Sequence, residues 1–219
     1  MGTKEPVSLE SAFGVLRQFA RRPRTAERCE LCSLEIGSQH PHLIEPIARK
    51  LVCACDACAL LFSGREGSRY KRVPRQTRLL ANFHMSDGQW DSLMIPINMA
   101  FFFRSSPESK VVALYPSPAG ATESMLSLEA WQEIVQENRE LEKMEPDVEA
   151  LLVNRIGHVR GFTQAEYYLL PVDQCYKLVG LIRSQWRGFS GGIEVWQQIA
   201  AFFAELRSNA MVIGGQGNA

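Results

Sequence analysis

Cysteine is distributed very unevenly along this sequence of 219 residues. Five of the six cysteines lie between positions 29 and 58, in the segments CELC and CACDAC, and only Cys175 lies elsewhere. Cysteines that cluster in this way bind a metal ion, carry out thiol chemistry or form disulfides. The choice among these three fates decides how the first third of the chain can fold.

The expected compartment bears on that choice. No stretch approaches the ~18 consecutive apolar residues that a membrane span needs, and the longest is the short MIPINMAFFF. The N-terminus has no apolar region of the secretory type, and Arg21 and Arg22 are followed by Pro23. We therefore expect a cytoplasmic protein. Because that compartment is reducing, disulfides are the least favoured fate and metal binding is the most favoured.

Two pairs of cysteines have the spacing of a zinc site. Cys29 and Cys32 form one CxxC pair, Cys55 and Cys58 form the second, and 22 residues separate the pairs. A CxxC pair on a tight turn presents two thiolates to one ion, and two such pairs complete a tetrahedral Zn²⁺ site. KLVC before the second pair is typical of a strand and ALLF after it of a helix. The pattern predicts a treble-clef/zinc-ribbon-like N-terminal module.

Further donors lie near these pairs and leave the ligand set open. Cys53, His40 and His42 are the additional candidates. In one interpretation four cysteines hold one zinc ion, and Cys53 lies beside the metal because it shares a strand face with Cys55. In another, a histidine replaces Cys53 or Cys55. In a third, the same cysteines hold iron, as a rubredoxin-like centre or an Fe–S cluster. Thiol redox chemistry is the remaining alternative.

The rest of the chain predicts a larger α+β domain. We expect an N-terminal helix and linker over residues 1–26, the cysteine-rich module over 27–77, a mixed β-sheet domain packed with helices over 78–208 and a flexible tail over 209–219. Within the large domain, we expect strands in LMIPINMAFFF, KVVALYP, EALLVNRI and EYYLLPV, a helix capped by Ser127, and two closing helices. Cys175 lies on the apolar stripe of the first closing helix, so we expect it to be a core residue.

Charge is balanced overall but not along the chain. Residues 1–80 contain 14 Lys+Arg against 8 Asp+Glu, a net charge of +6, and residues 81–219 contain 10 against 16, a net charge of −6. A basic half can contact nucleic acid, an acidic partner or the acidic half of its own chain. We expect a protein partner and regard nucleic acid as the less favoured one.

No catalytic site can be assembled from spacing. The loop YPSPAGATES, residues 115–124, lacks the lysine of a P-loop and favours a turn at a sheet edge. Asp147 and Glu149 share one face of an extended segment, where solvated acids are the common case. The HPH segment followed by CxxC is similar to that of HNH nucleases, but no histidine or Asn-Leu follows the second pair to hold a catalytic metal. The sequence leaves open whether the protein is an enzyme and favours one that is not.

Several segments in order resemble an uncharacterised bacterial family, a domain of unknown function. They are CELC, HPHLIE, LVCACDACALLF, WDSLMIPINMAFFF, YPSPAGATES, PDVEALLVNR and DQCYKLVGLIRSQWRGFSGG, and the resemblance covers residues 10–207. We associate this family with gene clusters of nickel–iron uptake hydrogenases. The resemblance carries over Cys29, Cys32, His42, Cys53, Cys55 and Cys58 as the metal-binding residues.

The resemblance and the cysteine pattern together imply a function. We expect a zinc-binding accessory protein that contacts hydrogenase subunits or maturation factors. The alternative is an iron-binding redox partner of a hydrogenase.

Overall fold

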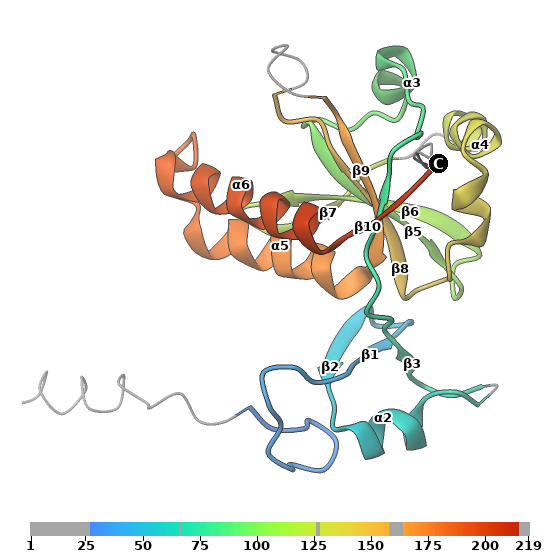
Figure 1. The fold of residues 1–219 in the computed structure, drawn as a ribbon, viewed down its shortest axis with the longest axis vertical. Coiled ribbons are helices and arrows are strands. Elements are labelled where there is room, and N and C mark those ends of the chain that lie inside the picture. Colours follow the sequence, from blue (N-terminus) through green and yellow to red (C-terminus); the bar gives the residue numbers. More distant parts are fainter. Residues whose placement is uncertain (1–26, 66, 126–127, 158–163, 215–219) are drawn as a thin grey trace, which may run out of the picture.

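The computed structural model describes residues 27–65, 67–125, 128–157 and 164–214. The helix and linker expected within residues 1–26, and the Ser127 cap, lie outside these ranges. The described chain forms two sheets, a small one near the N-terminus and a large one that contains most of the remaining strands (Figure 1). The fold is therefore of the expected mixed α+β class.

The smaller part, which we call the cysteine module, contains three short strands and one helix. β1 (His42–Glu45) pairs with β2 (Lys50–Cys53) and with β3 (Lys71–Arg72), and both pairings are antiparallel. Helix α2 (Asp56–Phe62) follows β2 directly and lies on the side of the module that faces away from the large sheet (Figure 1). This order of turn, hairpin and helix is compatible with the expected zinc-ribbon-like module.

The larger part, which we call the sheet domain, contains seven strands in the order β10-β4-β9-β8-β5-β6-β7. They are β4 (Arg78–Leu80), β5 (Met99–Ser105), β6 (Lys110–Ser117), β7 (Gly120–Glu123), β8 (Glu149–Asn154), β9 (Glu166–Pro171) and β10 (Met211–Ile213). Neighbouring strands are antiparallel except β10, which runs parallel to β4. The sheet is thus mixed, as its sequence pattern predicts.

Helices cover both faces of the large sheet. α5 (Val172–Gln185) and α6 (Gly192–Asn209) lie on one face, and α3 (Asp87–Ser92), α4 (Leu128–Glu137) and the 3-10 helix η1 (Arg139–Lys143) lie on the other (Figure 1). Successive side chains of a strand point to opposite faces. Phe101 and Phe103 accordingly join the core under α5 and α6, whereas Phe102 stacks on Trp131 of α4. Because both faces are covered, β5 is apolar almost throughout.

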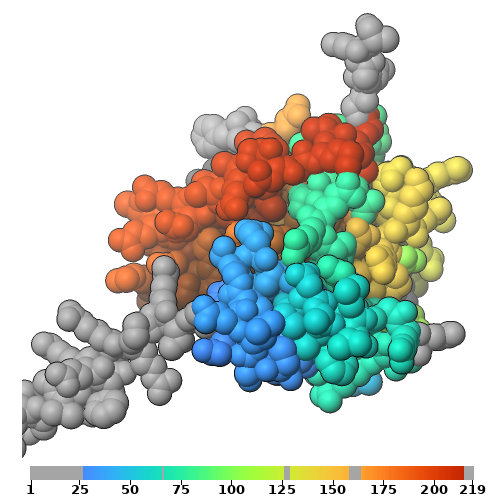
Figure 2. All heavy atoms as spheres, turned by 60° about the horizontal axis from the view of Figure 1, so that its bottom comes forward, coloured from blue at the N-terminus to red at the C-terminus, as the bar shows by residue number. Residues whose placement is uncertain are grey.

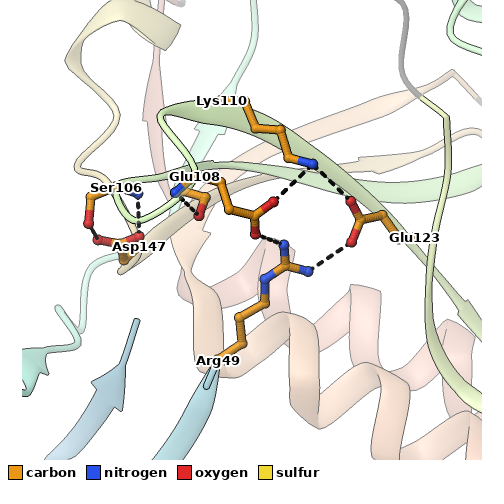
Figure 3. Close-up of polar contacts among 7 residues, drawn as sticks. Arg49, Ser106, Glu108, Lys110, Glu123 and Asp147 are labelled. Atoms are coloured by element: carbon orange, nitrogen blue, oxygen red, sulfur yellow. Dashed lines mark hydrogen bonds and ion pairs between the residues drawn. The ribbon is translucent and has the colours of Figure 1, made fainter. Parts of the chain in front are cut away.

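The two parts are packed against each other. Ile44 of β1 and Val73, just after β3, belong to the same apolar core as α5 and α6. Figure 2 views the molecule from the module side and shows the blue and cyan atoms of this part directly in front of the larger part. Polar contacts also cross this joint, among them the bonds of Arg49 to Glu108 and Glu123 (Figure 3). The module is therefore a docked part of one fold.

Several elements differ from the sequence-based expectation. The strand expected from residue 93 begins only at Met99, because α3 and its C-cap at Leu93 occupy the start of the expected segment. Residues 120–123 of the expected loop form β7, and residues 211–213 of the expected tail form β10. None of the helices in the described ranges has the length and apolar character required to cross a membrane.

Candidate metal centre

The first cysteine pair lies on a tight knuckle. The backbone N–H of Cys29 donates to the carbonyl of Leu34 at 2.8 Å, and the N–H of Ser33 donates to the carbonyl of Cys29 at 2.8 Å. Ser33 has a positive φ of 64°, which lets the chain reverse within so few residues. The turn brings the side chains of Cys29 and Cys32 to one side.

The second cysteine pair lies at the start of α2. Cys55 is the N-cap of this helix, and its sulfur accepts a hydrogen bond from the backbone N–H of Cys58 at 3.4 Å. A helix N-terminus carries a partial positive charge and unpaired N–H groups, which favour a thiolate over a thiol. The helix start therefore holds the second pair of sulfurs beside the N-terminus of α2.

These two pairs converge. The four sulfurs lie within 4.8 Å of one another, and Sγ of Cys32 is 3.7 Å from Sγ of Cys55. A tetrahedral ion with Zn–S bonds of about 2.3 Å places its sulfurs roughly 3.8 Å apart. All six cysteines are free thiols. The four-cysteine group thus has the composition and the spacing of a tetrahedral thiolate metal site.

The core of the module is too small to hold the module together by itself. It consists of Cys29, Leu43, Val52, Ala54, Cys55, Cys58 and Ala59. Three of these residues belong to the four-cysteine group, and two others are alanines. Segments of this size usually depend on a metal or disulfides for stability. A metal ion at this position would supply the stability that apolar burial does not.

The protonation of the four sulfurs also fits a cation. Burial acts to raise the pKa of Cys29, but backbone hydrogen bonds at Cys55, Leu31 and Cys32 outweigh it and lower the pKa to about 6. Burial, followed by the neighbouring thiols, raises the pKa of Cys58 to about 12. Adjacent sulfurs in one small group therefore cannot all be thiolates at neutral pH on their own. A bound divalent cation would displace the remaining protons.

The structure brings the other candidate donors together at a different place. His40, His42 and Cys53 form a second group, in which one ring nitrogen of each histidine and Sγ of Cys53 lie within 4.8 Å of one another. Cys53 does not share a face with Cys55, because β2 ends at Cys53 and the chain turns through Ala54 into α2. Burial, and then the carboxylates of Glu30 and Glu27, raise the pKa of Cys53.

Sequence reasoning missed one partner of this second group. Nδ1 of His42 lies 2.6 Å from Oδ2 of Asp173, a residue of the first turn of α5. The two residues are 131 positions apart, so no local pattern could pair them. A Cys–His–Asp arrangement does therefore exist in the fold, although spacing gave no sign of it.

The remaining candidates have structural surroundings. Asp147 and Glu149 are buried, and they pair with Lys71 at 2.6 Å and Arg78 at 2.5 Å respectively. Cys175 is fully buried in the core, as its position on the helix stripe predicts. Residues 115–124 form most of the β6–β7 hairpin. These acids and this loop serve the packing of the sheet domain and its joint with the module.

The fold and the four-cysteine group define a class: a mixed α+β protein with a candidate metal centre in a small module ahead of its large sheet. Residues 28–210 match the family of unknown function DUF5947, and the chain belongs to that family. The match runs from the residue before Cys29 to the residue after α6, so both parts of the fold belong to it. Comparisons with curated proteins and with solved structures gave no match.

Proposed function

We propose that this chain is a zinc-binding accessory protein that acts by binding another protein. The observation that carries the proposal is the convergence of four cysteine sulfurs within 4.8 Å. Zinc suits this group because it takes four thiolates in a closed tetrahedron and has no redox chemistry of its own. The ion then has a structural role, which is to fix the knuckle and α2 relative to each other.

The exposed face of α2 supports binding to a protein. Leu60, Leu61 and Phe62 are consecutive apolar residues of this helix, and their exposed fractions are 68%, 68% and 47%. Contiguous apolar residues at a surface are typical of protein–protein contact sites. Because α2 begins at two of the metal-binding cysteines, the metal would determine where this face points. The partner should therefore present an apolar groove to α2.

The identity of the partner rests on the sequence resemblance. We associate the resembling family with nickel–iron hydrogenase gene clusters, and on that ground we propose that the partner is a hydrogenase subunit or a maturation factor in the cytoplasm. An iron-binding redox role for the same four cysteines is the competing proposal, because a tetrahedral S₄ site also suits iron. The metal of the natively expressed protein distinguishes the two.

The first experiment is metal analysis of the full chain purified anaerobically from its native host. We expect a colourless protein that loses one equivalent of zinc when Cys55→Ser and Cys58→Ser are combined. Absorbance from sulfur-to-iron charge transfer, with iron in place of zinc, would establish the redox alternative instead. A double variant that holds as much zinc as the wild type would refute the four-cysteine site.

The second experiment tests the docking face. A tagged chain is expressed in the native host and the proteins that co-purify with it are identified. We expect a hydrogenase subunit or maturation factor with the wild type, and its loss with Leu60→Ser combined with Leu61→Ser. Ile193→Ser is the matched control, because Ile193 is 77% exposed on α6 and far from α2 in the sequence. Equal recovery with both variants would refute α2 as the contact site.

A further inference from the structure

We propose that His40, His42 and Cys53 form a second metal site, separate from the four-cysteine group and open to an external ligand. The three side chains lie where the cysteine module meets α5, and they offer two imidazole nitrogens and one sulfur to one ion. This site does not depend on the proposed function of the four-cysteine group, because the two groups share no residue.

The fold places the three side chains on one face of the hairpin. His42 of β1 lies directly opposite Cys53 of β2 in the antiparallel register. Side chains at directly opposite positions point to the same face, with Cβ atoms about 4.5–5.5 Å apart. His40 is two residues before His42, and the two rings meet edge to face with centroids 4.9 Å apart. The β1–β2 register thus builds the group.

His40 presents a nitrogen lone pair that has no protein partner. Its Nδ1 lies 2.8 Å from the carbonyl oxygen of Gly37, which can only accept a hydrogen bond, so Nδ1 carries the proton. The other nitrogen, Nε2, is therefore unprotonated in the neutral ring. The side chain is 8% exposed, and Nε2 is buried with no hydrogen-bond partner among the described residues. A buried lone pair of this kind is unfavourable unless it is bound.

His42 is oriented in the same way. Its Nδ1 donates to the carboxylate of Asp173 at 2.6 Å, and this again leaves Nε2 as the nitrogen with a lone pair. Histidines that bind metals characteristically donate their other ring N–H to a carboxylate or a backbone carbonyl. His42 has the first kind of partner and His40 has the second. Both rings therefore have Nδ1 engaged and leave Nε2 as the nitrogen that a metal ion can bind.

The donor set determines the class of ion and its chemistry. Two imidazoles and a thiolate suit Zn²⁺, which binds such ligands at about 2.0–2.3 Å, so a modest contraction of the group would complete three bonds. Three protein ligands leave the fourth tetrahedral position for water or another small ligand. The His42 side chain is 32% exposed, which gives solvent access to the site. The four-cysteine group has no such vacant position.

A thiol nucleophile is the other use for a cysteine, a histidine and an aspartate. That arrangement needs one imidazole as its base. It would leave the buried Nε2 of His40 without a partner, whereas a metal ion uses all three donors. The structure therefore favours the metal site.

Zinc stoichiometry tests the site in the full chain, purified in reductant with Zn²⁺ and then desalted. We expect two zinc ions per chain in the wild type and one in Cys53→Ser. Cys175→Ala is the matched control, because it removes a thiol outside both groups, and it should keep two ions. One ion in the wild type, or two in Cys53→Ser, would overturn the second site and leave the four-cysteine site untouched.

Asp173→Asn tests the site without removing a ligand. The loss of a carboxylate partner of a metal-binding histidine typically weakens metal binding 10- to 100-fold. We expect that loss for the weaker of the two ions in competition with a chromophoric chelator, with circular dichroism unchanged. An unchanged affinity would contradict the orientation of His42 by Asp173.

Co²⁺ substitution tests the open position. Azide should change the visible d–d spectrum of the Co²⁺-loaded wild type, and should have no effect on Cys53→Ser, which keeps only the closed four-thiolate site. A wild-type spectrum that does not respond to azide would show that the second site has no exchangeable ligand.

Discussion

The cysteine module and the sheet domain are stabilised in different ways. The sheet domain buries apolar side chains on both faces of its sheet, and its interior strand β5 is buried on each side. The module has a small core in which sulfur ligands replace large apolar side chains. Its contacts with the sheet domain add to this core, and in our proposal a bound ion does so as well. The comparison indicates that one short chain can combine a part that folds by burial with a part whose small core leaves room for coordination and docking.

Loss of the metal bound by the four-cysteine group should have the largest effect, and it should destabilise the module without destabilising the sheet domain. Cys55→Ser combined with Cys58→Ser should remove a metal contribution on the order of 10 kcal/mol, since binding to a structural site is coupled to folding. Hydrogen exchange should show loss of protection in β1, β2 and α2 and retained protection in β5 and β8. Cys175→Ala should keep protection in the module. A double variant whose module stays protected would show that docking alone holds the module.

A cavity in the sheet domain should destabilise that domain and leave the metal content of the module unchanged. Phe101 is fully buried beneath α5, where its ring lies 5.9 Å from that of Tyr176. Phe101→Ala should lower the free energy of unfolding by about 3–5 kcal/mol, because it removes apolar contacts and leaves a cavity. Denaturant unfolding measures the loss, and zinc per folded chain should not change.

Phe189→Ala is the control for that substitution, because Phe189 is fully exposed and should change stability by about 0.5 kcal/mol or less. If Phe101→Ala released zinc while the sheet domain remained folded, the two parts would not be stabilised separately.

The joint should show an intermediate effect. Asp147 is 2% exposed, pairs with Lys71 of β3 at 2.6 Å and accepts a hydrogen bond from the N–H of Ser106 at 2.8 Å. Asp147→Asn keeps the shape but removes the charge, and should cost about 1–3 kcal/mol. Faster hydrogen exchange in β3 and β4 than in β8 would locate the effect.

Glu140→Gln is the matched control, since Glu140 forms an exposed pair with Lys143 within η1. Equal effects of the two substitutions on the exchange of β3 would contradict a role for Asp147 in the joint.

Local patterns in the sequence predicted the parts of the fold that local forces decide. The two CxxC pairs predicted the four-cysteine group, and apolar periodicity predicted α5 and α6. β10 and β4 were missed because each has three residues and their parallel pairing joins distant segments. For the same reason the sequence did not reveal the contact of His42 with Asp173. It also did not reveal the pairing of Asp147 with Lys71 across the joint, or of Glu149 with Arg78 within the sheet domain. The strand register and the packing of distant segments decide which donor atoms lie close together, and composition does not reveal either.

The smallest expected effect concerns the surface charges at the joint. Arg49, in the turn between β1 and β2, bonds Glu108 and Glu123, and Lys110 reaches the same two carboxylates at 2.9 and 3.4 Å (Figure 3). Arg49→Met keeps most of the apolar contact with the joint and should weaken docking by about 1 kcal/mol or less, since partly exposed ion pairs contribute little.

The effect of Arg49→Met on hydrogen exchange should depend on salt, and the direction of that dependence tests whether charge is its cause. The difference between Arg49→Met and wild type in hydrogen exchange of β1 and β2 should shrink as salt rises toward about 1 M, where screening acts within roughly 3 Å. Arg207→Met is the matched control, because Arg207 pairs with Glu166 inside the sheet domain and should leave exchange in the module unchanged. A difference that persists at high salt would mean that Arg49 holds the module through packing on Phe103, whose ring centroid lies 5.6 Å from its guanidinium. In that case the joint would be stabilised by burial, as the sheet domain is. The proposed metal centre would then be the remaining difference in how the two parts are stabilised.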